Sequence, residues 1–246
     1  MRGSFLKLKN RASVLDHLEE LRWRLAASLV AVTLFALAGS FFSKPLLEFL
    51  ISPLKNAGGD YTLYFQSPQE GFLTYLKVSV VAGLLAASPV LFMELWLFVA
   101  PGLHRNEKKL VIILISASSI LFLVGIAFAF WLLVPWGLKF FLRFQTDSLR
   151  PLLRIDSYFS FLVGIVLGSG LIFDLPVVLL GLVKLGVVDV LTLKRARRFV
   201  AVFCFVITAI ITPTTDPVTQ IVLAVPLILL YEGCLLVAGW LGKKKE

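Results

Sequence analysis

The chain has 246 residues, of which 59% are hydrophobic and 16% charged, and its mean hydropathy is +0.92. A soluble domain of this size cannot bury so much apolar surface, so the composition predicts a polytopic membrane protein. The net charge of +9 does not indicate nucleic-acid binding, because the basic residues lie in clusters between apolar runs rather than along one soluble face.

Residues 1–22 form a charged amphipathic N-terminus that we expect on the cytoplasmic side of the membrane. A capping box of Ser13 and Asp16 predicts a helix that starts near Val14 and continues into the first apolar run. The acidic residues of this segment argue against a cleavable signal peptide, whose leading region is short and basic.

Two carboxylates lie at the membrane edge of this helix, each within one turn of an arginine. Glu20 and Arg24 are four residues apart, and Glu19 and Arg22 are three apart. Such pairs can neutralise each other on one helix face. The alternative is that a carboxylate at this position binds a basic partner.

Six apolar runs predict an all-α fold with six transmembrane helices, at residues 23–42, 72–98, 110–136, 158–183, 199–211 and 218–241. The last two are expected to be short. The fifth run crosses a thinned bilayer, or else polar residues back to Lys194 lengthen its helix. In the fourth run, Gly164, Gly168 and Gly170 predict close helix contacts.

The distribution of Lys and Arg predicts that both termini are cytoplasmic. Seventeen of the 24 basic residues fall on the side of the N-terminus and six on the opposite side. The single membrane domain, 1–246, then ends in a cytoplasmic tail at 242–246. The segments 43–71 and 139–157 become extracytoplasmic loops, expected either to form a cap, with a helix at 45–53, or to be mobile linkers.

Asp174 is the most unusual residue of the apolar runs, because an ionisable group at that depth costs several kcal/mol unless it is neutral, paired or in contact with water. It indicates a functional group, or a protonated carboxyl near a kink at Pro176. Glu94 lies near the cytoplasmic end of its run, where it is expected to reach the interface. Gln220 is expected to form an interhelical hydrogen bond.

Glu107 lies among basic residues at the start of the third run. A carboxylate there compensates the dipole at a helix N-terminus. It is also expected at the same depth of the membrane as Glu20, so the two could bind one ligand together.

The sequence contains no constellation typical of an enzyme. It has no phosphate-binding glycine-rich loop and no HExxH motif, and its two histidines, His17 and His104, are far apart. Cys204 and Cys234 both lie in apolar runs, where neither a disulfide nor a metal site is expected. We therefore predict a protein without catalysis, cofactor or metal.

An ordered set of motifs resembles the TatC family, the large subunit of the twin-arginine protein translocase. The motifs cover nearly the whole chain and are HLEELRWRL (17–25), SPQEGF (67–72), SPVL (88–91), FVAPGL (98–103), SYFSF (157–161), FDLPV (173–177), TP (212–213), TQ (219–220) and YEG (231–233). Four prolines are expected to be structural: Pro68, Pro101 and Pro176 in these motifs, and Pro53 at the end of the expected helix 45–53.

The resemblance implies a receptor for the twin-arginine signal peptides of folded cargo proteins, in the inner membrane of a prokaryote. It also implies assembly with single-span TatA/TatB-type subunits and with further copies of itself, and transport that the proton-motive force drives. The residues that it implies for signal-peptide binding are Glu20, Glu107, Arg22 and His17. Those that it implies for docking of the small subunits are Gln220, Thr212 and Asp216.

Two positions depart from the family pattern, since Asp174 stands where the family usually carries Glu and Glu94 where it commonly has Gln. The competing interpretation from another class is a proton-coupled secondary transporter with Asp174 as its proton site. Such carriers often contain inverted repeats, and the two halves of this chain show no convincing repeat.

Overall fold

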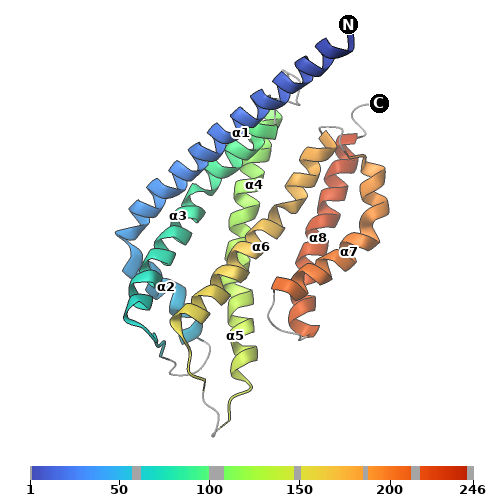
Figure 1. Ribbon diagram of the computed structural model, residues 1–246. Helices are drawn as coiled ribbons and strands as arrows, with labels where there is room; N and C mark the ends of the chain where they lie inside the picture. The colour runs from blue at the N-terminus through green and yellow to red at the C-terminus, as the bar shows by residue number, and fades with distance from the viewer. Residues whose placement is uncertain are drawn as a thin grey trace.

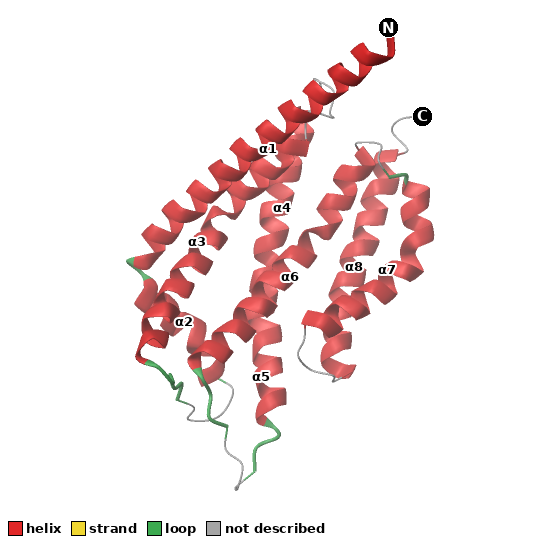
Figure 2. Cartoon of the chain, in the orientation of Figure 1, coloured by secondary structure: helices red, strands yellow, loops and turns green. Residues whose placement is uncertain are grey.

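The computed structural model describes residues 2–56, 62–99, 108–146, 151–184, 188–211 and 217–242. Within these ranges the protein is mainly helical, and an isolated β-bridge joins Tyr64 to Arg154 (Figure 2). Four helical stretches are long and apolar enough to cross a membrane: His17–Ser40, Pro68–Val99, Lys109–Leu142 and Ile155–Lys184. The all-α membrane class is therefore confirmed, with the first four expected spans at their predicted places.

Helix α1 (Arg2–Ser40) is longer than predicted. The expected start near Val14 is wrong, because the helix passes through the Ser13–Asp16 box and begins at Arg2. Neither proline nor a β-branched run interrupts residues 2–12, so the box is not a helix end. Farther along, the side chains of Leu25 and Leu29 are 68% and 67% exposed, as expected for a helix whose outer face contacts lipid.

Helix α3 (Pro68–Val99) packs along α1 over much of its length (Figure 1). It starts at Pro68, which suits the first helical turn because a proline lacks the N–H that would have no partner there. The two backbones meet at Gly83, where a Cβ atom would lie 2.5 Å from the backbone nitrogen of Ala36. Only glycine allows this approach.

The contact at Gly83 predicts an effect on stability. Gly83→Ala is expected to lower the free energy of unfolding by about 1–3 kcal/mol, because the added methyl group overpacks the crossing of α1 and α3. Gly164→Ala in a later helix is the matched control, since no atom lies within 4 Å of a Cβ built there. Thermal unfolding in detergent checks both variants, and equal midpoints would contradict the prediction.

A continuous rod forms the third span. It consists of α4 (Lys108–Phe128), a π-helical turn η3 (Ala129–Leu133) and α5 (Val134–Leu142). The amide of Val134 bonds to the carbonyl of Ala129, five residues back, and this wide turn immediately precedes Pro135, whose ring does not fit a regular α-helix.

Helix α6 (Ile155–Lys184) forms the fourth span and packs along α4. The predicted loop 139–157 is too long at both ends, because α5 continues to Leu142 and α6 already starts at Ile155. Lys139 is helical and exposed, which suits a long side chain whose charge can reach the interface. Of the glycines expected to allow close contacts, Gly170 lies against Phe122, whereas Gly164 has open space around it.

The two long loops form a joint cap at one end of the bundle. The predicted helix at 45–53 is present as α2 (Ser43–Lys55), with Pro53 buried on its inner side. Tyr64 exchanges two backbone hydrogen bonds of 2.9 Å with the segment before α6, through Leu153 and Ile155. The described parts of the loops are therefore joined to each other rather than free linkers.

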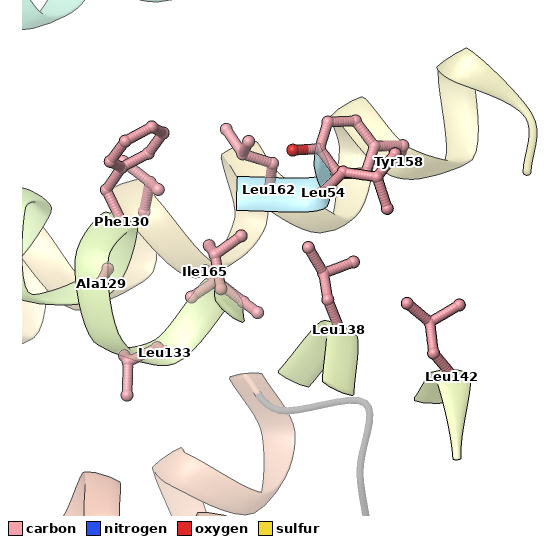
Figure 3. Close-up of a cluster of buried hydrophobic side chains, with 11 residues drawn as sticks. Leu54, Ala129, Phe130, Leu133, Leu138, Leu142, Tyr158, Leu162 and Ile165 are labelled. Carbon is pink, nitrogen blue, oxygen red and sulfur yellow. The ribbon is translucent and has the colours of Figure 1, made fainter. Parts of the chain in front are cut away.

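An apolar cluster fastens this cap to the spans (Figure 3). The side chains come from α2, the η3 turn, α5 and α6, and those labelled are Leu54, Ala129, Phe130, Leu133, Leu138, Leu142, Tyr158, Leu162 and Ile165. The Tyr158 hydroxyl donates a 2.6 Å hydrogen bond to the carbonyl of Leu50. Glu70 accepts 2.8 and 2.9 Å hydrogen bonds from the Gln66 amide and from Arg154.

Helices α7 (Val190–Ile211) and α8 (Pro217–Gly242) pack against each other and join the rest of the bundle mainly through α6 (Figure 1). With 22 and 26 residues, they are shorter than α1, α3, α6 and the continuous rod of α4, η3 and α5. Helix α7 is nevertheless about 33 Å long, because the polar residues before the fifth apolar run are helical. Of the two alternatives for the fifth run, the structure has the helix lengthened by polar residues, and this helix begins four residues before Lys194.

Candidate functional site

Arg24 links two carboxylates from different helices near the end of the bundle that carries the N-terminus. On α1, its Nε and Nη2 atoms donate to Oε1 of Glu20 at 3.0 and 2.6 Å. Its Nη1 atom donates to Oε2 of Glu94 on α3 at 3.0 Å. The predicted Glu20–Arg24 pair is confirmed, and Glu94 is a second partner that helical spacing could not reveal.

His17 extends this cluster on its membrane-distant side. Its Nδ1 atom lies 3.8 Å from Oε2 of Glu20. Its ring stacks on Phe98 of α3, with the ring centroids 4.3 Å apart and the planes 11° from parallel. The stacking ties the first turns of the α1 span to the end of α3, and Phe98 is a member of the site that sequence reasoning did not single out.

The other predicted pair on α1 does not form. Glu19 and Arg22 are both exposed, and neither makes an ion pair with a described residue. Of the four residues expected to bind a signal peptide, the structure brings Glu20 and His17 together and places Arg22 on the same helix. Glu107 lies outside the described residues, as does Pro101.

Asp174 lies inside the bundle rather than toward lipid, with 4% of its surface exposed. The indole Nε1 of Trp96 on α3 donates a 3.0 Å hydrogen bond to the Ser118 hydroxyl on α4. That hydroxyl lies beside the Asp174 carboxyl on α6. Because an indole can only donate, the single proton of Ser118 is left for Asp174.

One oxygen of this carboxyl is without a partner. Oδ1 of Asp174 is buried and accepts no hydrogen bond from a described residue. Trp96 is held by close packing on α6, where a Cβ at Gly181 would lie 2.3 Å from its ring. The three helices therefore hold a polar chain, Trp96 to Ser118 to Asp174, inside an otherwise apolar core. Helix α6 continues through Pro176.

Polar contacts also hold the α7–α8 hairpin together. Nε2 of Gln220 donates a 2.8 Å hydrogen bond to the carbonyl of Phe205, so the expected interhelical bond is confirmed. At the other end, the Tyr231 hydroxyl donates to the carbonyl of Leu193 at 2.7 Å, and Arg197 pairs with Glu232. Thr212 and Asp216, expected in the docking region, lie outside the described residues.

Candidate metal ligands do not gather in the part of the chain that the structure describes. No group of three or more His, Cys, Asp or Glu side chains there is placed to hold a metal ion. Cys204 and Cys234 are both free and buried, and the thiol of Cys234 contacts the carbonyl of Pro176 at 3.4 Å.

Membrane-length helices, a charged cluster at one end and a buried carboxyl inside the bundle define a polytopic helical membrane protein. The family model "Sec-independent protein translocase protein (TatC)" matches residues 16–226. The chain therefore belongs to the TatC family. It is a component of a protein translocase and not an enzyme.

Individual relatives agree with this assignment. A TatC protein of Desulforapulum autotrophicum is 39% identical over 94% of this chain and 86% of its own length. A chloroplastic TatC protein of Arabidopsis thaliana is 42% identical over 94% of this chain and 66% of its own length. A crystal structure of the twin-arginine translocase receptor TatC is 36% identical, with a TM-score of 0.76 over 91% of this chain and 98% of that one.

Proposed function

We propose that this protein is the receptor and core scaffold of a twin-arginine translocase. It binds the paired arginines of signal peptides on folded cargo, and the proton-motive force drives the transport that follows. The proposed location is the inner membrane of a prokaryote, with six spans and both termini in the cytoplasm. Family membership and the excess of basic residues on the N-terminal side support this proposal.

The observation that carries the proposal is the guanidinium group already bound by the cluster. Glu20 and Glu94 together accept three N–H bonds from Arg24. Planar guanidinium groups pair with carboxylates through several donors at once, whereas a lysine ammonium acts as a point charge. A surface that binds one arginine in this way has the chemistry to select arginine in a peptide.

We assign the four expected binding residues to this surface on the same basis. Glu20 is the carboxylate that pairs with the peptide, and Glu107, which directly precedes α4 in the sequence, supplies a second carboxylate. His17 holds the surface in place through its stacking on Phe98. Arg22 lies two residues from both Glu20 and Arg24 on α1 and is free of ion pairs with described residues, which leaves it available to peptide acceptors.

A comparison of two peptides tests the proposal. A signal peptide with paired arginines is expected to bind the purified protein at least about tenfold more tightly than the same peptide with paired lysines. The reason is that a lysine cannot form the set of charge-assisted hydrogen bonds that a planar guanidinium group donates to carboxylates. Binding is measured by fluorescence anisotropy in detergent micelles. Equal binding of both peptides, or of neither, would contradict the receptor function.

The α7–α8 hairpin is the surface we propose for the single-span TatA/TatB-type subunits, at its end near Gln220, Thr212 and Asp216. The hydrogen bond from Gln220 to Phe205 fixes the two helices at that end. Large apolar side chains along the hairpin, among them Val202 and Phe203, are more than half exposed and suit a partner helix within the membrane. Self-association of the active complex is part of the same proposal.

The unpartnered oxygen of Asp174 is the one observation that favours the alternative, a proton-coupled secondary transporter. Family membership and the arginine cluster favour the receptor. Proton uptake by vesicles that contain this protein alone would favour the alternative.

A further inference from the structure

The carboxylates of Glu20 and Glu94 are occupied by a residue of the chain itself. Glu20 on α1 and Glu94 on α3 carry two negative charges, and Arg24 between them contributes one positive charge. The side chains are 34%, 16% and 23% exposed in that order, so the group lies at the surface but is largely shielded from water. Three donors of the guanidinium are used.

We propose that Arg24 is a specificity-determining residue, an internal arginine that an incoming arginine must displace from Glu20 and Glu94. This inference rests on the proposed receptor function and adds how the same surface rejects other cations. Arg24 touches both carboxylates and forms its bonds with the donor group that the proposed ligand carries.

The physical basis is a comparison of the hydrogen bonds and the charge of the cluster before and after one cation replaces another. When one guanidinium replaces another, the number of charge-assisted hydrogen bonds and the charge of the cluster stay the same. When a lysine ammonium replaces Arg24, the planar set of bonds is lost, and the exchange is unfavourable. An unoccupied pair of carboxylates would instead attract any cation, so the resident arginine increases discrimination.

The geometry also permits the release of Arg24. Its side chain is partly exposed and belongs to a helix whose neighbouring leucines contact lipid or solvent. A long arginine side chain can extend its charge toward the interface once it leaves the carboxylates. The cluster keeps a net negative charge while Arg24 is bound, and this charge attracts a cationic peptide before the exchange.

Binding of the two peptides, paired arginines and paired lysines, to three variants tests the inference. Arg24→Gln is expected to bind the arginine peptide about fivefold more tightly than the wild type and to gain more for the lysine peptide, so that the ratio of affinities falls. Arg24→Lys keeps the charge but loses the planar set of guanidinium hydrogen bonds, and it is expected to change the two affinities and their ratio less, in the same direction.

Arg195→Gln is the matched control. Arg195 is an exposed arginine near the start of α7, it forms no ion pair with a described residue, and its replacement removes the same charge from the same end of the bundle. Both affinities of this variant are expected to equal those of the wild type. An equal gain for Arg195→Gln would assign the effect to net charge and overturn the inference.

The outcomes separate the inference from the proposed function. If the wild type prefers arginine but Arg24→Gln and Arg24→Lys bind it less tightly, Arg24 merely positions Glu20 and the inference is wrong. An unchanged ratio of affinities in both variants also overturns it. If the wild type shows no preference for arginine, the receptor function itself fails. Arg24→Lys keeps the inference testable where Arg24→Gln does not fold.

Discussion

Replacing Glu20 by glutamine is expected to weaken binding of a twin-arginine peptide between about tenfold and about a hundredfold. Glutamine keeps the size and one acceptor oxygen of the side chain but loses the charge that pairs with a guanidinium. Because Glu20 lies at the surface of α1, the fold and the membrane insertion of the variant are expected to stay intact. Crosslinking of a photoreactive arginine peptide to the protein in membranes measures the effect.

Glu19, the residue next to Glu20, provides a closely matched control. Glu19→Gln removes the same charge from the adjacent position, but Glu19 is exposed and makes no ion pair with a described residue. It is expected to bind the peptide like the wild type. Equal losses in both variants would show that the peptide senses only the total charge of this helix. Unchanged crosslinking in Glu20→Gln would remove Glu20 from the binding surface.

Asp174→Asn is expected to leave peptide binding unchanged and to lower transport to less than about a tenth of the wild-type rate. Asparagine has nearly the same shape and keeps an oxygen that accepts a hydrogen bond from Ser118, but it cannot gain or release a proton. Asp174 is buried on α6, and it forms no ion pair or hydrogen bond with Glu20, Arg24 or Glu94. Transport of a folded cargo into inverted membrane vesicles measures the rate.

Two further variants serve as a comparison and as a control for Asp174→Asn. Ser118→Ala removes the hydrogen-bonding neighbour of the carboxyl and is expected to lower transport less than Asp174→Asn. Asp189→Asn, at an exposed position directly before α7, makes the same chemical change and is expected to leave transport unchanged. Loss of peptide binding in Asp174→Asn would place this residue in the receptor surface, and full transport activity would end its proposed role.

Hydropathy predicted the helices well, since each apolar run of about 20 residues must form its backbone hydrogen bonds internally in a bilayer. The boundaries were less accurate where helices extend beyond the apolar core. Helix α1 begins at Arg2, and α5 continues to Leu142, because Lys and Arg tolerate helical structure at the interface. The pairing of Tyr64 with the segment before α6 joins positions about 90 residues apart, and no local pattern predicts it.

The candidate site was predictable in part. Helical spacing indicated the Glu20–Arg24 pair, and depth in an apolar run singled out Asp174. The partners from other helices were not predictable, because which faces of two helices meet depends on packing and not on periodicity. Glu94 beside Arg24 and Ser118 beside Asp174 are such partners.

By itself, the sequence determined the membrane class, the order of the helices, the family and the residues whose charge is unusual for their depth. These properties depend on composition, spacing and ordered motifs, all of which are local to the chain. Only the tertiary structure decided that Arg24 lies between carboxylates of two helices and that Asp174 faces Ser118 inside the bundle. The reason is that side chains 56 and 70 residues apart meet only where helices cross, and close approaches such as that at Gly83 set those crossings.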